Sequence, residues 1–409
     1  MVTCGRQYPS VIRCSQSGPR FAEWDRVGAV PWMEGRLTTS AIEAGVGGSA
    51  SMTPRVVFAC INGLHVDDAV AIAKHMTVPN CFLDLNSMTV HDEPPSIDGH
   101  STPLNLRQVI GAIFAPWIHR GDTIVLPQDV GILPQLVRAS CRRKGCLVAL
   151  MPDGLVSQSP VDSGSPWRRR VRRLVYRALR ATGIGSGQPG LMGSSRPDLV
   201  LGWGEGWRTA LTQTSGAQFV AVGAARMDAH RLIPPPDTGT PRLLVCSQPI
   251  GGLPGSADIW PRWYSFLAGL PEELGDGMQV RIRLHPAEAG RGEVPGTLTG
   301  LPVRPLVEDL GWATHVASPF STVLLEALVA GRMPIVLEDA ALVTHLDSIP
   351  LFADPRLPRA SWKLDDLRAA MLRHDDWRAL AEDYASASGS ASQRIALNLE
   401  LLYEARVIR

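Results

Sequence analysis

Short apolar runs alternate with longer amphipathic stretches along most of this chain. Four nearly continuous apolar runs predict buried strands at residues 56–61, 81–85, 123–126 and 147–151. The stretches between them predict helices at residues 66–76, 104–117 and 132–144. A proline-rich segment predicts a loop from residue 86 to 103. Apolar strands that alternate with helices in this way are typical of a parallel sheet covered on both faces.

The same alternation returns in the second half of the chain after two interruptions. Residues 155–197 form a polar insertion with one basic helix, and strands are then predicted at 199–203 and 219–222, with a helix after Glu205 between them. Residues 231–241 contain three successive prolines and predict a linker. Beyond the linker we predict strands at 243–246, 280–284, 314–317 and 334–337, and helices at 260–270, 323–329, 364–372, 377–384 and 395–407.

These elements predict an α/β protein with two Rossmann-like domains and a cleft between them. We assign residues 53–235 to an N-terminal domain, 236–385 to a C-terminal domain and 386–409 to a C-terminal helix. Residues 1–52 are rich in Gly, Ser, Pro and Arg and predict a disordered leader, with Met33 or Met52 as an alternative start. A folded cap docked through Trp24 and Trp32 is the other interpretation of the leader. In open parallel sheets ligands bind beyond the carboxyl ends of the strands, so we expect the site in the cleft.

Composition excludes several classes of protein. A net charge of +1 over 409 residues indicates no overall attraction to nucleic acid or membrane. The 7 cysteines are scattered without a Cys-x-x-Cys pair, which argues against a disulfide framework and a zinc site. No apolar run reaches the roughly 18 residues of a membrane span, and the N-terminus has no signal-peptide pattern. We therefore expect a cytoplasmic protein.

His285 ends one predicted strand of the C-terminal domain and is followed by Pro286, which cannot continue the ladder. Arg281 and Arg283 alternate with apolar residues along that strand, so both arginines face away from its apolar side. Guanidinium groups bind phosphate oxygens in a bidentate way, and this group therefore suits a phosphate. A histidine that only caps the strand turn is the alternative.

Ser318, Ser321 and Thr322 come directly before the helix predicted at 323–329. One of these hydroxyls is expected to cap the helix. The start of a helix also offers free backbone N–H groups, which receive anions, so the same residues are candidates for a phosphate site. Glu326 in this helix is either an ordinary surface charge or a cleft residue that holds a ribose or sugar hydroxyl.

Candidate residues of the N-terminal domain also follow strand ends. Asp153 and Gly154 follow the fourth strand, and Asp153 is either a turn residue or a general base for an acceptor hydroxyl. Asp129 follows the third strand and is a rival for that role. Gly63 follows the first strand and would allow a substrate close to the backbone. His65 beside it is interpreted as a helix-entry residue, with a catalytic role as the alternative.

The predicted basic helix carries seven arginines between Arg168 and Arg180. Such a run is usually a solvated face; the alternative is a surface for an anionic acceptor or a peripheral contact with an anionic membrane leaflet. It lacks the interleaved aromatic residues of a single-strand platform, and we predict no nucleic-acid partner. The chain also has no Walker loop, no His-Glu-x-x-His motif and no Gly-x-Ser-x-Gly elbow.

Several of these motifs, taken in order, resemble bacterial surface-polysaccharide transferases with the GT-B fold. The greatest likeness is to the polysialyltransferase and related capsule sialyltransferases, with the CDP-glycerol glycerophosphotransferases as relatives. The motifs that carry the resemblance are Asp153-Gly154, Val222-Gly223-Ala224-Ala225-Arg226-Met227-Asp228, Arg283-Leu284-His285-Pro286 and Ser321-Thr322-Val323-Leu324-Leu325-Glu326-Ala327. The resemblance implies that His285 and Pro286 contact a cytidine nucleotide and that Ser321 and Thr322 hold its phosphate. It also implies that Asp153 is the base, although Pro152 stands where those families have a second acid.

The activity implied is that of a metal-independent, inverting glycosyltransferase. It would move a sugar from a nucleotide donor, CMP- or CDP-linked, to a hydroxyl of a glycan or small molecule. No Asp-x-Asp motif is present, and no cofactor is expected beyond the nucleotide sugar as co-substrate. Two alternatives stay open: a sugar-nucleotide epimerase of the same fold, and a non-catalytic nucleotide-binding protein.

Overall fold

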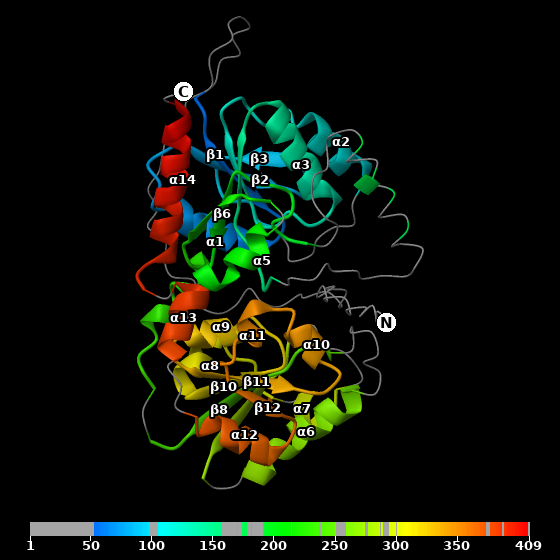
Figure 1. Cartoon of the computed structure of the whole chain (residues 1–409), viewed down its shortest axis with the longest axis vertical. Coiled ribbons are helices and arrows are strands. Elements are labelled where there is room, and N and C mark those ends of the chain that lie inside the picture. The colour runs from blue at the N-terminus through cyan, green and yellow to red at the C-terminus, as the bar shows by residue number, and fades with distance from the viewer. Residues whose placement is uncertain are drawn as a thin grey trace, which may run out of the picture.

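Two parallel sheets, one above the other in Figure 1, organise the computed structural model of this chain. The residues it describes are 53–97, 105–156, 170, 174, 176–177, 181, 191–213, 215–236, 239–250, 259–274, 277–286, 288, 294–299, 301–373, 377–386 and 388–407. The predicted leader, residues 1–52, lies outside them.

The first sheet has seven strands in the order β3-β2-β1-β4-β5-β6-β7. All neighbours are parallel except β2 and β3. The prediction of an unbroken loop after residue 85 is wrong at β3, a short edge strand. The strands are β1 Val56–Cys60, β2 Asn80–Asp84, β3 Thr89–His91, β4 Thr123–Leu126, β5 Leu147–Leu150, β6 Leu199–Gly202 and β7 Gln218–Ala221.

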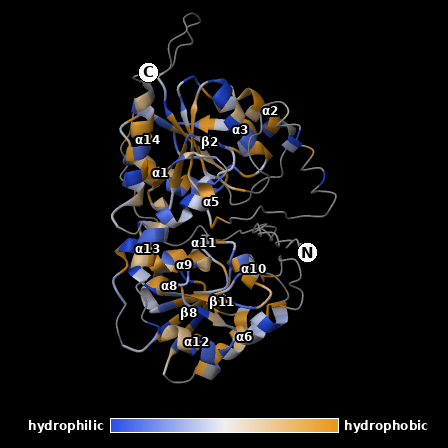
Figure 2. Cartoon of the chain, viewed as in Figure 1, coloured by the Kyte–Doolittle hydropathy of each residue, from blue (hydrophilic) through white to orange (hydrophobic). Residues whose placement is uncertain are grey.

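Helices cover both faces of this sheet, as its apolar strands predict. Successive residues of β1 point to opposite faces: Val56 and Phe58 join a core with α1 (Gly63–Ala73) and α14 (Ala391–Val407). Val57 instead joins a core with α2 (Leu106–Phe114) and α3 (Ile132–Arg143). Figure 2 shows the apolar strands among helices that carry both apolar and polar residues.

The second sheet has five parallel strands in the order β12-β11-β10-β8-β9. Its last strand, β12, and two short helices, α10 and α11, are absent from the sequence-based prediction. The strands are β8 Arg242–Cys246, β9 Gln279–Arg283, β10 His315–Ser318, β11 Met333–Glu338 and β12 Arg359–Ser361. The helices are α6 Ile259–Leu274, α7 Gly296–Thr299, α8 Leu306–Trp312, α9 Val323–Val329, α10 Val343–Leu346, α11 Pro350–Ala353, α12 Leu364–Met371 and α13 Trp377–Ala385.

The two domains meet where α13 packs on the segment after β6. This segment comprises η1 (Glu205–Trp207) and α5 (Arg208–Thr212). Trp207 donates its indole N–H to the Tyr384 carbonyl at 2.8 Å, and the two rings lie edge to face. A Cβ on Gly204 would lie 2.3 Å from the Asp383 carbonyl oxygen, so only glycine permits this approach. Beyond α13 the chain returns to the N-terminal domain as α14, the red helix in Figure 1.

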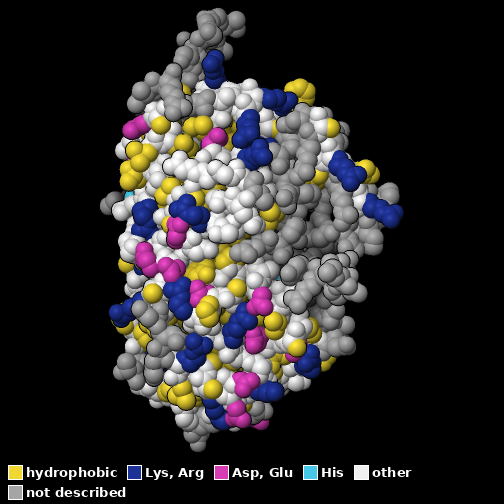
Figure 3. Space-filling view, in the orientation of Figure 1, with side chains coloured by type: hydrophobic (Ala, Val, Ile, Leu, Met, Phe, Trp, Pro, Cys, Tyr) yellow, Lys and Arg dark blue, Asp and Glu magenta, His cyan; other side chains and the backbone are white. Residues whose placement is uncertain are grey.

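The strand orders locate a crevice in each sheet. An open sheet binds ligands at the carboxyl edge, where connections from neighbouring strands leave toward opposite faces. In the first sheet this point lies between β1 and β4, and in the second between β8 and β10. On the face drawn in Figure 3, acidic and basic side chains are interspersed without a large patch of one sign.

Candidate functional site

A hydrogen-bonded pair, His65 and Asp153, lies at the carboxyl edge of the first sheet. His65 is in the first turn of α1, directly after β1, and Asp153 is in the loop after β5. His65 Nε2 lies 3.0 Å from Asp153 Oδ2, although the residues are 88 positions apart. The Asp153 side chain is 26% exposed, and His65 is the one described residue that hydrogen-bonds to its carboxylate. One carboxylate oxygen is therefore open to a ligand.

The tautomer of His65 follows from its other ring nitrogen. The backbone N–H of Ile61 donates to His65 Nδ1 at 3.2 Å, so Nδ1 carries no proton. The ring is thus neutral, and Nε2–H donates to the Asp153 carboxylate. Because both nitrogens are occupied and the ring is only 5% exposed, His65 orients Asp153 and has no free nitrogen to accept a substrate proton.

Arg226 fastens the Asp153 loop to helix α1. It belongs to η2 (Ala225–Met227), and its Nη2 donates to the Asp153 backbone carbonyl at 2.8 Å. The Arg226 backbone N–H donates to Asp68 Oδ1 at 2.8 Å, and the guanidinium stacks over Trp203. Burial raises the pKa of Asp68, and the positive charge of Arg226 opposes that rise. This arginine falls inside the motif at residues 222–228, but a site role for it was not predicted.

The other N-terminal candidates take different positions. Asp129 is 1% exposed, and its two carboxylate oxygens accept the backbone N–H groups of Gly193 and Ser195 at 2.8 and 2.9 Å. Burial raises the pKa of Asp129, and these hydrogen bonds lower it. Its carboxylate is thus held within the turn that it stabilises. Gly63 begins α1, and a Cβ at Gly154 would meet nothing within 4 Å, so space is open beside Asp153.

In the second sheet, the start of α9 lies at the switch point after β10. Ser318 is fully buried and donates its hydroxyl to the Cys246 carbonyl at 2.8 Å, which ties β10 to β8. Ser321 Oγ accepts the Val323 N–H at 3.2 Å and begins the helix. Among the described residues, none accepts a hydrogen bond from the backbone N–H of Ser321 or Thr322. These amides are available to an anion.

Glu326 connects this helix start to the first domain through His230, in η3 (His230–Leu232). Burial lowers the pKa of His230, the Glu326 carboxylate raises it, and Arg226 lowers it, so His230 lies near both charges. His230 Nδ1 is buried and has no partner in the described part of the chain. Glu326 is 8% exposed, and no described residue bonds to its carboxylate. Since Arg226 bonds to the Asp153 loop and η3 packs against α9, the segment from Arg226 to η3 lies between the two sheet edges.

His285 and Pro286 follow β9, at the same carboxyl edge as the α9 start. Two strand spacings separate β9 from β10, or about 10 Å. Glu288, which is completely buried, accepts hydrogen bonds from the His285 backbone N–H, the Ser247 hydroxyl and the Tyr264 hydroxyl, each at 2.9 Å. Glu288 thus fixes the turn that presents His285. The sequence-based prediction did not include Glu288. An acidic residue three positions after a histidine at a strand end is the signal that could have indicated it.

The two arginines of β9 are engaged by the protein itself. Arg283 Nη1 lies 2.9 Å from Asp309 Oδ2 and also donates to the Arg304 carbonyl. Arg281 is stacked 4.0 Å from the Trp312 ring centroid and lies 3.6 Å from Asp309. The structure thus places both guanidiniums against α8, where they share the single carboxylate of Asp309, and a phosphate role for Arg283 has no support from these contacts.

Three further predictions concern the basic helix, metal ions and membrane spans. Most of Arg168–Arg180 lies outside the described residues; within it, Tyr176 accepts the Gly131 N–H at 3.2 Å through its hydroxyl. In the described part of the chain, no cluster of three or more His, Cys, Asp or Glu is arranged to hold a metal ion. The described helices include none with the length and apolarity of a membrane span.

Several solved structures share the architecture of this chain. No family model and no curated protein sequence matches the chain. A protein described as a UDP-N-acetylglucosamine 2-epimerase from Listeria monocytogenes is 12% identical, with 85% of this chain and 96% of that chain covered and a TM-score of 0.54. The structure of S. aureus MnaA with UDP is 11% identical, with 86% of this chain and 96% of that chain covered and a TM-score of 0.52. The structure of a variant of the wall teichoic acid polymerase TagF with CDPG is 12% identical, with 87% of this chain and 89% of that chain covered and a TM-score of 0.50.

These likenesses define the class of fold. The chain is a GT-B protein: two α/β domains with parallel sheets, matched over most of its length. At 11–12% identity the likeness establishes architecture and leaves the chemistry to the site.

Proposed function

We propose that this protein is a glycosyltransferase that moves a sugar from a nucleotide donor to an acceptor hydroxyl. The observation that carries the proposal is Asp153, a carboxylate oriented by His65 with one oxygen open, on a loop held by Arg226, shortly before the η3 segment that packs against α9. A positioned carboxylate in one domain can act as a base, and unbonded N–H groups in the other can bind an anion. Together they suit a reaction between an acceptor and a nucleotide.

In the proposed reaction, the open oxygen of Asp153 removes the proton of the acceptor hydroxyl. The acceptor oxygen attacks the anomeric carbon from the side opposite the phosphate, and the bond from that carbon to the phosphate oxygen breaks. The configuration inverts, and the nucleotide leaves with the bond's electron pair. His65 and Arg226 hold the base in place, which raises the effective concentration of the reacting groups.

The departing phosphate would lie at the start of α9. The free N–H groups of Ser321 and Thr322 would stabilise its charge, and His285, on the turn fixed by Glu288, would contact the nucleotide. Glu326 would accept a hydroxyl of the ribose or sugar. A CMP- or CDP-linked donor and independence of a divalent ion remain parts of this proposal, supported by the sequence resemblance and the absence of an Asp-x-Asp motif.

Binding and product analysis together test the proposal. Thermal-shift measurements with CMP, CDP, UDP and GDP, with and without EDTA, should show stabilisation by a cytidine nucleotide, because a ligand that binds only the folded state raises the Tm. Incubation with donor and acceptor should then give an inverted glycoside. Absence of nucleotide binding, or transfer that survives His285→Ala and Asp153→Asn unchanged, would overturn the assignment.

A sugar-nucleotide epimerase is the second candidate. The two neighbours with TM-scores of 0.54 and 0.52 favour it: one is described as a UDP-N-acetylglucosamine 2-epimerase, and the other was solved with UDP. An epimerase needs no separate acceptor. Incubation with the donor alone therefore separates the candidates: an epimerised donor without transfer supports the epimerase, whereas no change until an acceptor is added supports the transferase.

A further inference from the structure

An open groove lies where β11 and β12 of the second sheet end, and its lining includes none of the residues proposed for catalysis. Two cavities, of about 620 and 450 Å³, share Arg262, Trp362 and Lys363 and so form one continuous space. These volumes are in the range of sites that bind small molecules. The remaining lining comes from the start of α6, the turn after β11 and the turn after β12, and none of it belongs to the Asp153 cluster or to α9.

The aromatic side of the groove is held rigidly from behind. Trp362 packs on Trp263, with ring centroids 4.9 Å apart. Trp263 is completely buried, and its indole N–H donates to the Ser247 hydroxyl at 2.9 Å. The Trp362 indole nitrogen is itself buried and makes no hydrogen bond to any described residue. A fixed aromatic surface with one unused donor is therefore present before any ligand arrives.

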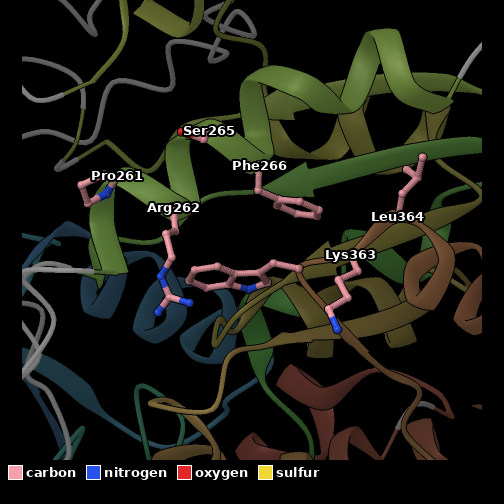
Figure 4. A pocket seen from close by; sticks show the side chains of 7 residues that line it. Pro261, Arg262, Ser265, Phe266, Lys363 and Leu364 are labelled. Atoms are coloured by element: carbon pink, nitrogen blue, oxygen red, sulfur yellow. The ribbon is translucent and has the colours of Figure 1, made fainter.

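The charges around the groove leave one cation unmatched. Arg262, 59% exposed, pairs with Asp339 at 2.9 Å, and Glu338 pairs with Arg359 at 3.2 Å. Within the described chain, the exposed ammonium of Lys363 has no partner. In Figure 4, Arg262 from α6 and Lys363 from the turn after β12 flank the opening, and Phe266 lies above it. The groove thus combines aromatic faces, paired charged groups and one free positive charge.

We propose that this groove binds a sugar unit of an acidic saccharide. One face of a sugar ring is made of C–H groups and suits an aromatic surface, whereas its hydroxyls need polar partners at the ring edge. The Arg262–Asp339 pair offers both donors and an acceptor. Lys363 would pair with the carboxylate or phosphate that the saccharide carries.

The identity of this saccharide as the acceptor rests on the proposed function, whereas binding to the groove does not. A polymeric acceptor needs contacts beyond the one hydroxyl that reacts. Contacts with the non-reacting part of the substrate supply binding energy that orients the reacting group. A groove outside the reacting site would hold such an acceptor through a neighbouring sugar. The Trp362 groove would accordingly affect acceptor affinity.

The unused indole N–H of Trp362 provides a direct readout. The full chain is labelled with ¹⁵N-tryptophan, and the Trp362 indole signal is assigned by its loss in Trp362→Phe. The probes are trigalacturonate, a hyaluronan tetrasaccharide and a maltotriose phosphate, with neutral maltotriose as the uncharged comparison. We expect at least one acidic probe to shift the Trp362 signal in a saturable way, and maltotriose to bind at least about tenfold more weakly because it lacks the partner of Lys363.

Variants test whether the groove itself is responsible. Lys363→Gln should weaken the acidic probe about tenfold, whereas Lys74→Gln, an exposed lysine of the first domain, should have no effect. Trp362→Ala should abolish the saturable binding, and the Tm of each variant checks folding. A Trp362 signal unmoved by all three acidic probes, or equal binding by Lys363→Gln and the parent chain, overturns the proposal. Saccharide binding without nucleotide binding would refute the proposed function alone, and the reverse would refute the groove alone.

Discussion

The carboxyl edges of the two sheets use polar side chains in different ways. At the first edge, His65, Asp153, Arg226 and Asp68 bond to one another, and a single carboxylate oxygen is left open. At the second edge, the α9 start leaves backbone N–H groups unbonded. An oriented carboxylate suits proton transfer, and unpaired amides suit anion binding. The comparison teaches that similar strand-end patterns can produce either a hydrogen-bonded network of side chains or a helix start with unbonded backbone amides.

Loss of the open carboxylate should have the largest effect. Under the proposed function, Asp153→Asn removes the base, and kcat for transfer should fall by about 10²- to 10⁴-fold. The Kd for nucleotide should stay the same, because the nucleotide would bind to the other domain. Steady-state kinetics and calorimetry measure the two quantities. Asp67→Asn, an exposed acid on α1, is the matched control, and equal kcat values in both variants would refute the role of Asp153.

Removing the group that orients the base should have a smaller effect. His65→Ala deletes the donor to Asp153, and we expect kcat to fall by about 10²-fold at unchanged donor KM because the base is misplaced. His65→Gln keeps a side-chain N–H that can reach the carboxylate and should recover part of the rate. Equal losses in the two variants would indicate that His65 serves only to pack α1. Kinetics at matched folded fraction decide between these outcomes.

The anion site of the second edge is tested by Thr322→Val. This change removes one hydroxyl at nearly constant volume, and the Thr322 hydroxyl has no hydrogen-bond partner among the described residues. A hydrogen bond to a charged phosphate contributes about 1.5–3 kcal/mol, so the Kd for a nucleotide should rise about tenfold or more. Calorimetry measures this change. Thr209→Val on α5, at an exposed threonine outside the proposed site, should leave the Kd unchanged, and an equal effect there would contradict the assignment.

The smallest effect is expected at Asp228, an acid near the first edge with a structural role. Its carboxylate accepts hydrogen bonds from Ala391 N–H and from the N–H and hydroxyl of Ser392, and so caps α14. Burial raises the pKa of Asp228, but these bonds outweigh burial and the net pKa is lowered. Asp228→Ala should cost about 0.5–2 kcal/mol of unfolding free energy and leave kcat unchanged.

The pH dependence of this loss follows from the sign of the shift. A lowered pKa in the folded state stabilises the protein above the ordinary value of 3.8, and that contribution disappears as pH falls through the folded-state pKa. The difference in unfolding free energy between the parent chain and Asp228→Ala should therefore be full near neutral pH and shrink below pH 3.8. Urea unfolding across this range measures it, with Asp365→Ala, 96% exposed, as the control. A difference that persists at low pH would contradict the capping role.

Much of the fold was predictable because its signals are local. The helix predicted at residues 323–329 is α9 with the same bounds, since an apolar helical run begins after two hydroxyl residues and ends before Gly331. The strands predicted at 123–126 and 243–246 fall on β4 and β8. The three-residue edge strands β3 and β12 escaped prediction because their hydrogen bonds depend on neighbours that only the folded sheet supplies.

The candidate site was less predictable, as two aspartates illustrate. Asp129 and Asp153 each follow an apolar strand, and their local sequences give no reason to prefer either. In the fold, residues 193–195 surround the carboxylate of Asp129, whereas His65 orients that of Asp153 and leaves it partly exposed. The same limit applies to His65, for which local sequence leaves both a helix-entry role and a catalytic role open.

The sequence by itself therefore determined the alternation of strands and helices, the two-domain α/β class and the residues at each strand end. Hydrophobic periodicity, helix-capping residues and helix-terminating glycines act over a few residues, so they can be recognised from the local sequence alone. The tertiary structure alone decided which strand-end groups meet, which are consumed by structural hydrogen bonds, and which face open space. Those outcomes depend on contacts such as His65 with Asp153, 88 residues apart, whose geometry exists only after the sheet has formed.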